Sequence, residues 1–244
     1  MKKIQTSIIL LLIIGVVSCK KNDSATMPAT ANSVSSDQFA TITTGSLAAN
    51  SSGLTSNFDD ITTALIVIKQ GCGTTVTDST TQSGSSNGAT YNYLLKYTHT
   101  LTCNESNQQD NIQYDLKYNG HFDGPAMSSL DTGTSTFKIA GFTPHAQTYL
   151  INGEYKRSSA FTMKTGEKVS GTSTVDIVVT SLLITKTTRM ITGGGATITV
   201  TVTVPKGKST YSAPVTFNGD GTATVTINGT KYSINLLTGV VTAQ

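Results

Sequence analysis

Apolar and polar residues alternate with a period of two through most of the chain from residue 91 onward, and this feature restricts the fold most. In the segment "ATITVTVTV", Ile198, Val200, Val202 and Val204 alternate with threonines. Successive side chains of a β-strand point to opposite faces of a sheet, so the segment predicts a strand with an apolar inner face. Threonine suits the outer face because its β-branched side chain favours strands and its hydroxyl is wettable.

Two neighbouring segments rich in tyrosine show the same alternation. Residues 91–103 and 112–118 each place tyrosine and aliphatic side chains on one face and mostly polar side chains on the other. Amphipathic rings of this kind either line a cleft for a sugar or a lipid or pack as ordinary core beneath a helix. The candidate ligand face consists of Tyr93, Tyr97, Tyr114 and Tyr118.

The turns indicate how the strands are connected. Further strands are expected near 135–141, 147–163, 171–186, 195–204, 211–218, 222–228, 230–237 and 239–243. Asn228-Gly229 is a strong signal for a two-residue hairpin. Short turns without helical crossovers favour antiparallel pairing of neighbours, hence a meander.

Strand length adds a second constraint. The segments 147–163 and 171–186 could each span ~40 Å or more unless they bend at Gly153 or Ser158-Ser159. Long strands with one apolar face favour a large curved sheet, closed or half closed into a barrel, over a compact sandwich. The sequence therefore predicts an all-β fold of long antiparallel meandering strands that form a curved sheet or half-barrel.

One short N-terminal helix is expected before the strands. Phe58, Ile61, Leu65 and Ile68 recur at helical spacing in "SNFDDITTALIVIKQGCG", and Ser56 can cap the start. The β-branched run at 61–68 keeps a strand as the alternative. A helix here would cover the concave face or one open end of the sheet.

Three parts of the chain follow from composition. Residues 1–18 have two lysines and a short apolar core, as in a secretory signal peptide, and the core falls short of the ~20 residues that span a bilayer. Residues 19–53 are rich in Ser, Thr, Ala and Asn, and predict a flexible tether because they offer little apolar surface to bury. Residues 54–244 are expected to form a single β-rich domain.

Val16-Val17-Ser18-Cys19 resembles the lipobox of bacterial lipoproteins. The resemblance implies that the Cys19 thiol receives a diacylglycerol, that the chain is cut before Cys19, and that the new amine is acylated. Several acyl chains on one residue anchor a protein stably where one chain does not. The expected partner of the N-terminus is thus a membrane.

The start "CKKND" resembles outer-membrane lipoproteins of the Bacteroidota, as does the Thr/Gly-rich style of the remainder. Residue 20 is Lys and not the Asp that marks retention at the inner membrane in enterobacterial lipoproteins. The resemblance implies a lipid anchor in the outer membrane, with the domain on the periplasmic face or at the cell surface. It implies no activity.

Cys72 and Cys103 remain as a pair once Cys19 is set aside for lipidation. An oxidising compartment makes a disulfide the natural interpretation. The alternative is a reactive or metal-binding pair of thiols, but there is no C-x-x-C and no His within a few residues of Cys72.

Charge excludes one class of partner. The net charge of +3 falls to +1 when Lys2 and Lys3 leave with the signal segment, and charged residues make up only 13% of the chain. A domain without a basic field has little attraction for a polyanion, so nucleic acid is not an expected partner. The expected partners are a small apolar ligand or another protein of the cell envelope.

No catalytic, metal or cofactor motif emerges. The three histidines, His99, His121 and His145, fall on separate segments and no two share a strand at i, i+2. There is no G-x-S-x-G elbow for a nucleophile. A glycan hydrolase would need two carboxylates facing each other across a cleft, which a sequence alone does not locate. The expectation is that the protein is not an enzyme, with no metal and no cofactor.

Two short segments match the Asp-Ser/Thr-aliphatic/Thr pattern of protein O-glycosylation in Bacteroidota. They are Asp23-Ser24-Ala25 and Asp78-Ser79-Thr80, both in stretches expected to be flexible. Ser24 and Ser79 are therefore candidate glycosylation sites.

The leading hypothesis for the function is a lipid-anchored, non-enzymatic structural or binding protein. The alternatives are an apolar-ligand or lipid carrier in a β half-barrel and a glycan hydrolase.

Overall fold

The computed structural model describes residues 34–67, 71–143 and 145–244. In this part of the chain eleven strands form one antiparallel sheet, in which each strand pairs with the next in sequence. The strands are β1 Thr75–Ser86, β2 Ala89–Cys103, β3 Gln109–Asp123, β4 Met127–Ala140, β5 Thr148–Met163, β6 Ser170–Thr185, β7 Ile191–Val204, β8 Gly207–Phe217, β9 Thr222–Ile227, β10 Thr230–Asn235 and β11 Val241–Ala243. The predicted all-β meander is confirmed.

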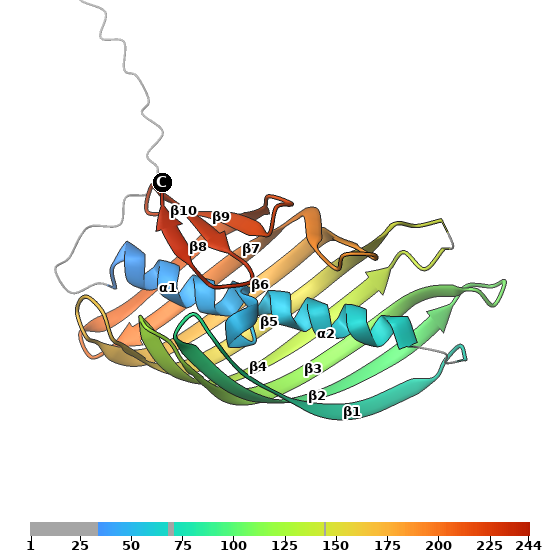
Figure 1. Ribbon diagram of the computed structural model, residues 1–244, viewed down its shortest axis with the longest axis horizontal. Helices are drawn as coiled ribbons and strands as arrows, with labels where there is room; N and C mark the ends of the chain where they lie inside the picture. Colours follow the sequence, from blue (N-terminus) through green and yellow to red (C-terminus); the bar gives the residue numbers. More distant parts are fainter. Residues whose placement is uncertain (1–33, 68–70, 144) are drawn as a thin grey trace, which may run out of the picture.

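Figure 1 shows the sheet curled around two helices that cross its concave face. They are α1 Ser36–Leu47 and α2 Leu54–Val67, joined by the short 3₁₀ helix η1 Ala49–Ser51. The sheet is open, because β1 and β11 are its two edges. The expected half-barrel therefore has its interior occupied by helices.

The helix predicted near residue 58 is confirmed as α2, and the strand alternative for this segment is wrong. Phe58, Ile61 and Leu65 are buried against the sheet, as their helical spacing predicts. The Phe58 ring lies 5.0 Å from the ring of Phe137 on β4, measured between centroids. α2 thus packs its apolar side into the concave face of the sheet.

The expectation of a flexible tether over residues 19–53 is wrong for residues 34–53, which form α1 and η1. The Ser35 hydroxyl accepts a hydrogen bond from the Gln38 backbone and the Gln38 side chain accepts one from Ser35, a capping box. Phe39, Ile42 and Leu47 are buried. The small residues between Ile42 and Leu47 are buried as well. Residues 19–33 lie outside the described residues.

Two strand segments also differ from the prediction. β1 occupies residues 75–86, a stretch expected to be flexible, and β4 begins at Met127, where the sequence predicted a strand only from about 135. β1 is almost wholly exposed and has no apolar face, so its sequence lacks the alternation that predicts a strand. In the first part of β4 the inward-facing residues Ser129 and Asp131 are polar, so apolar and polar residues do not alternate there.

The expected turn and bend are present. Asn228 and Gly229 both have positive φ, 48° and 84°, and connect β9 to β10 as the I′-type hairpin that the dipeptide favours. β5 bends at a shift of register between Ile151 and Gly153. A Cβ on Gly153 would lie 2.1 Å from the Thr136 carbonyl oxygen, so the close approach of β4 requires glycine there.

The two faces of the sheet differ in chemistry. The concave face contributes a continuous apolar core, including Ile198, Val200 and Val202 on β7 as predicted. On the convex face, hydroxyls bond to one another between strands, as between Thr199 and Ser212 at 3.0 Å. Among the described helices none is both long and apolar enough to cross a membrane.

Candidate functional site

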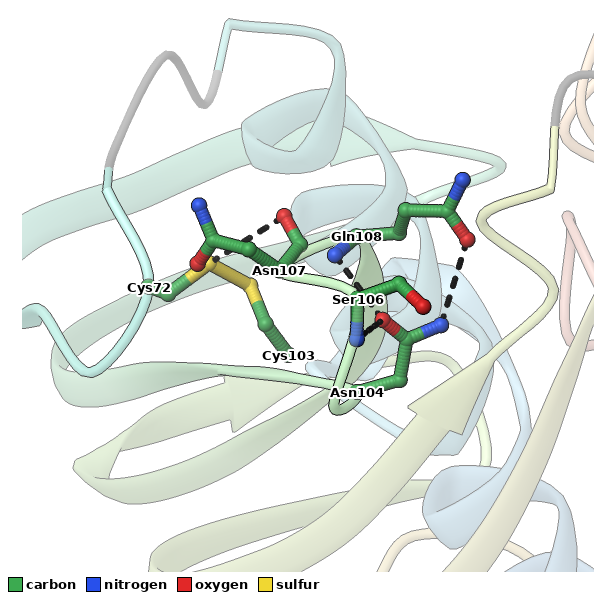
Figure 2. Close-up of a disulfide and its surroundings, with 6 residues drawn as sticks. All are labelled: Cys72, Cys103, Asn104, Ser106, Asn107 and Gln108. Carbon is green, nitrogen blue, oxygen red and sulfur yellow. Dashed lines mark hydrogen bonds between the residues drawn. A yellow bond between two sulfur atoms is a disulfide. The ribbon is translucent and has the colours of Figure 1, made fainter.

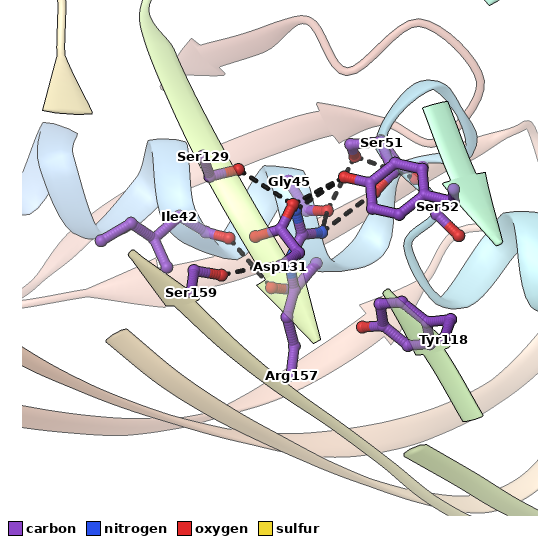
Figure 3. Close-up of polar contacts among 12 residues, drawn as sticks. Ile42, Gly45, Ser51, Ser52, Tyr118, Ser129, Asp131, Arg157 and Ser159 are labelled. Atoms are coloured by element: carbon purple, nitrogen blue, oxygen red, sulfur yellow. Dashed lines mark hydrogen bonds and ion pairs between the residues drawn. The ribbon is translucent and has the colours of Figure 1, made fainter. Parts of the chain in front are cut away.

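A buried ion pair holds the helical segment to the sheet. Arg157 on β5 and Asp131 on β4 lie 2.5 Å apart between Nη2 and Oδ2, and their side chains are 3% and 0% exposed. Arg157 also donates to the carbonyl oxygens of Gly45 and, at 3.0 Å, Ser51. Figure 3 shows the guanidinium group between Asp131 and these two carbonyls. The positive charge therefore lies where the end of α1 concentrates negative partial charge.

The electrostatics of this pair favour the ionised forms. Burial by itself would raise the pKa of Asp131, but the adjacent Arg157 and the hydroxyl donors outweigh burial and lower that pKa. Tyr93 and Ser129 donate to Asp131 Oδ2 at 2.7 and 2.9 Å. Each added donor spreads the carboxylate charge over another hydrogen bond, which is the condition under which a buried pair is tolerated.

The tyrosines of the candidate ligand face lie beneath the helices. Tyr93, Tyr114 and Tyr118 are buried, and Tyr97 is partly exposed. The Tyr118 hydroxyl donates to the Tyr155 hydroxyl at 2.6 Å, and Tyr155 donates to the Ser52 carbonyl. These rings act as core and as anchors for the turn between α1 and α2. None of the four lines the two hollows described below.

A gap, here called the seam, lies along the helical segment. One wall of the seam is residues 81–91, from the end of β1 and the start of β2, and the other wall is the C-terminal segment 236–241. The floor of the seam is η1. Ala49 donates its backbone N–H to the Leu236 carbonyl at 2.8 Å, and Asn50 Nδ2 donates to the Thr238 carbonyl at 2.7 Å. These two bonds fasten the C-terminal segment to the floor and divide the seam into a larger and a smaller hollow.

The larger hollow has a volume of about 740 Å³ and mixed walls. Phe58 and Leu236 supply apolar surface, and three charged side chains border it: Asp59, Arg189 and Asp220. Arg189 Nε lies 3.6 Å from Asp59 Oδ1, and Arg189 Nη1 donates to the Thr63 hydroxyl. The hollow thus combines hydrophobic surface with convergent polar groups, the usual make-up of a ligand site.

A perturbed carboxyl group lies beside this hollow. Burial raises the pKa of Asp60 to about 6, with the neighbouring Asp59 adding to the increase and a hydrogen bond from Gln82 opposing it. The bond joins Gln82 Nε2 on β1 to Asp60 Oδ2 on α2, so it connects the wall of the seam to the helix. Asp60 itself does not line the larger hollow, but its neighbour Asp59 and its bonding partner Gln82 do.

The smaller hollow has a volume of about 180 Å³ and lies on the other side of Asn50. The second half of α1, the β3–β4 turn and the C-terminal segment enclose it. Phe122, Met127 and Val241 are among its apolar walls, and no charged residue lines it. Its chemistry is therefore distinct from that of the larger hollow.

Acidic pairs outside the seam are used structurally. Glu154 and Asp176 lie together on the convex face, where Lys156 forms an ion pair with Glu154 at 2.7 Å. At the border of the larger hollow, Asp220 Oδ1 likewise accepts two bonds from Thr222 within its own turn. Over the described ranges no group of three or more His, Cys, Asp and Glu side chains is placed to hold a metal ion.

The predicted disulfide is confirmed. Cys72 and Cys103 are bonded, with Cα atoms 5.5 Å apart, and the bond joins the segment before β1 to the end of β2. Figure 2 shows the neighbouring turn, in which Asn104 Oδ1 accepts the backbone N–H groups of Ser106 and Gln108. The disulfide therefore holds in place the start of β1, the end of the strand that lies away from the seam.

The remaining predicted residues are distributed as follows. Cys19 and Ser24 lie outside the described residues. Ser79 is exposed on β1, in a regular strand and not in a flexible stretch. His99 is buried on β2, its ring stacked on Tyr97 at 6.2 Å, whereas His145 is exposed in the β4–β5 connection.

Sequence reasoning missed Arg157 and Asp131, although a signal existed. Both fall on the inward parity of their strands: Arg157 lies two residues from the buried Tyr155, and Asp131 six from the buried Phe137. A charged residue at an inward position indicates a buried partner of opposite charge, because an unpaired charge there is too costly.

Comparison with known proteins found no matching family model, curated protein or solved structure.

Proposed function

We propose that the protein is a lipid-anchored, non-enzymatic binding protein of the bacterial outer membrane, and that its ligand occupies the larger hollow of the seam. The observation that carries the binding role is the hollow itself. Its volume of about 740 Å³ falls within the 300–1,000 Å³ of common ligand sites, and its walls combine apolar surface with Asp59 and Arg189. The disulfide and the lipobox-like segment ending at Cys19 support an oxidising compartment and an anchor.

The interior is less suited to carrying a lipid. α1, η1 and α2 cover the concave face, and the apolar room beside α1 is about 180 Å³. A carrier of long acyl chains requires an empty apolar concavity of several times that size. The hollow in the seam is therefore the better place for a ligand than the half-barrel itself.

A glycan hydrolase is the weaker alternative. Such an enzyme needs one carboxyl group as acid and another as nucleophile or base, separated by about 5–9.5 Å. Asp59 is engaged by Arg189, and Asp220 is engaged by the Thr222 hydroxyl and amide of its own turn. The carboxylates that border the hollow are thus already used in ion pairs and hydrogen bonds, which favours binding over catalysis.

The anchor is tested by incorporation of labelled palmitate in wild type and in Cys19→Ala. We expect label in the wild type only, and equal labelling in both would overturn the anchor. Surface proteolysis of intact cells, with and without permeabilisation, then decides between the periplasmic face and the cell surface.

The binding site is tested with a panel of oligosaccharides, peptides and envelope glycopeptides, using NMR shift perturbation and thermal shift. Gln82 on β1 faces α2 and lines the larger hollow, so Gln82→Trp fills the hollow, and Thr201→Trp on the convex face is the matched control. We expect at least one ligand to bind the wild type and the control but not Gln82→Trp. Absence of any binding, or equal binding by all three proteins, contradicts the proposal.

A further inference from the structure

The smaller hollow has the features of a separate ligand site. It is lined by apolar side chains, among them Phe122, Pro125, Met127 and Val240, and its volume is about 180 Å³. An apolar cavity of about 150 Å³ in another protein stays free of water and binds benzene. The hollow is therefore large enough for one six-membered ring with a substituent.

One buried hydroxyl in its wall lacks a partner. Thr44 on α1 lines the hollow, is 6% exposed, and its Oγ1 makes no hydrogen bond. Thr43 and Thr55 in the helices share this state, but Thr43 does not line the hollow and Thr55 lines the larger one, whereas Thr41 and Thr62 donate to the carbonyl four residues earlier. A buried hydroxyl without a partner is uncommon because it loses its bonds to water and gains none.

The charge of the walls restricts the ligand further. None of the residues that line the hollow is Asp, Glu, Lys, Arg or His. A carboxylate or an ammonium group would lose its hydration without gaining an opposite charge, which excludes an ionised ligand. A fully apolar ligand would leave the Thr44 hydroxyl without a hydrogen-bond partner.

The floor of the hollow is held rigidly. Gly45 and Ser51 both line it, and Arg157 donates to both of their carbonyl oxygens from the buried side. Asn50, which also lines the hollow, bonds to the Thr238 carbonyl across its edge. A site fixed in this way loses little entropy when a ligand enters.

We propose that the smaller hollow binds a small neutral amphiphile, with an apolar body about the size of a benzene ring and a single hydroxyl or carbonyl group. The apolar body occupies the space between Phe122, Met127 and Val240. The Thr44 side chain turns about its Cα–Cβ bond to present its hydroxyl to the polar group of the ligand. The site is independent of the larger hollow and goes beyond the function proposed for it.

The test compares phenol with benzene, which differ by one hydroxyl group, by NMR titration of the full domain. We expect phenol to bind about tenfold more tightly than benzene, as one added hydrogen bond provides. The shift changes should centre on Thr44, Met127 and Val240. Shift changes confined to other regions, or equal affinity for the two probes, would overturn the proposal.

Three variants separate the site from general effects on folding. Thr44→Val should abolish the preference for phenol while leaving benzene affinity within twofold. Thr43→Val is the matched control, because Thr43 is also fully buried with an unpartnered hydroxyl but does not line the hollow. Ala89→Leu fills the hollow and should weaken both probes at least tenfold. A preference for phenol retained in Thr44→Val, or lost equally in Thr43→Val, contradicts the assignment.

Discussion

In the closed interior, Arg157 pairs with Asp131 Oδ2 and donates to the carbonyls of Gly45 and Ser51, and Asp131 Oδ1 is left without a partner. At the seam the hydroxyls of Thr44 and Thr55 have no partner, and room remains beside them. Both regions are built on the same helical segment. On the interior side the long strands β4 and β5 supply partners from an uninterrupted ladder of paired residues. On the seam side the segment faces β1, the C-terminal segment 236–241 and the turns around Pro125 and Arg189, and hollows remain.

This difference suggests that the interior determines the stability of the fold and that the seam determines ligand binding. The interior uses charge and hydrogen bonds to fix where the helices lie, so changes there should cost folding free energy. The seam keeps room and unsatisfied groups, so changes there should alter local opening and ligand binding more than global stability. Each of the following predictions tests that division.

The largest effect is expected from removal of the buried cation. Arg157→Met leaves Asp131 buried without its counter-charge and should lower the free energy of unfolding by about 3–5 kcal/mol. The double variant Arg157→Met with Asp131→Leu should recover most of that loss, because neither charge is then buried alone. Urea unfolding monitored by circular dichroism measures both. A loss below about 1 kcal/mol in the single variant would mean that the pair does not hold the helices.

The disulfide should matter next, through the sheet edge at the start of β1. Cys72 and Cys103 are 31 residues apart, so Cys72→Ser with Cys103→Ser should cost about 3–4 kcal/mol of stability by the loop-entropy estimate. Hydrogen exchange should accelerate most at the start of β1, next to the bond. Unchanged protection of β1 amides would indicate that pairing with β2 alone orders that edge. Free-thiol counting on the unfolded, unreduced protein should find neither cysteine free.

A dependence on pH should appear beside the larger hollow. The pKa of Asp60 is about 6 in the folded protein and 3.8 as an ordinary side chain, so the folded state favours the protonated form. The carboxyl group's contribution to stability is complete below pH ~4 and is lost as pH rises through 6, by up to about 3 kcal/mol. Asp60→Asn should therefore match the wild type near pH 4 and exceed it at pH 8.

The measurement is urea unfolding of both proteins from pH 4 to pH 8. Asparagine still accepts the hydrogen bond from Gln82, so the difference between the two curves reports the charge of residue 60. Parallel curves over this range would show that residue 60 is already solvated in the folded protein.

The smallest effect should come from the fastening of the C-terminal segment. Asn50→Ala removes the bond to the Thr238 carbonyl and should cost about 1 kcal/mol locally. The Ala49 amide, which donates to Leu236, should then exchange about fivefold faster. Thr201→Ala on the convex face is the control and should leave that rate unchanged. An unaltered rate in Asn50→Ala would show that backbone bonds alone close the seam.

Several features of this fold were predictable from the sequence, and particular residues show why. Ile198 and Val200 alternate with threonines and face the core as predicted, because the direction of a side chain in a strand follows from parity alone. Asn228-Gly229 forms the predicted hairpin, because its turn needs two positive φ angles. The cysteine pair followed from counting the cysteines once Cys19 was set aside as the expected lipidation site.

The candidate site was predictable only in small part. The tyrosine face was expected either to bind ligand or to pack as core, and Tyr93 and Tyr118 lie in the core. Nothing local to β1 identified it as a strand, since its residues gain their order from pairing with β2 and from the disulfide. The two hollows arise where three distant segments meet, and no local pattern encodes such a meeting.

The sequence by itself determined the antiparallel meander, the parity of its faces, the helix over residue 58 and the disulfide, because each depends on periodicity, turn chemistry or a count of residues. Only the tertiary structure decided that residues 36–51 form helical turns inside the half-barrel and that Arg157 reaches their carbonyls. The physical reason is that α1 has few large apolar side chains of its own. α1 is ordered by packing against the curved sheet. The sheet does not close around the helices, because β1 and β11 are its edges, and the seam lies between these edges.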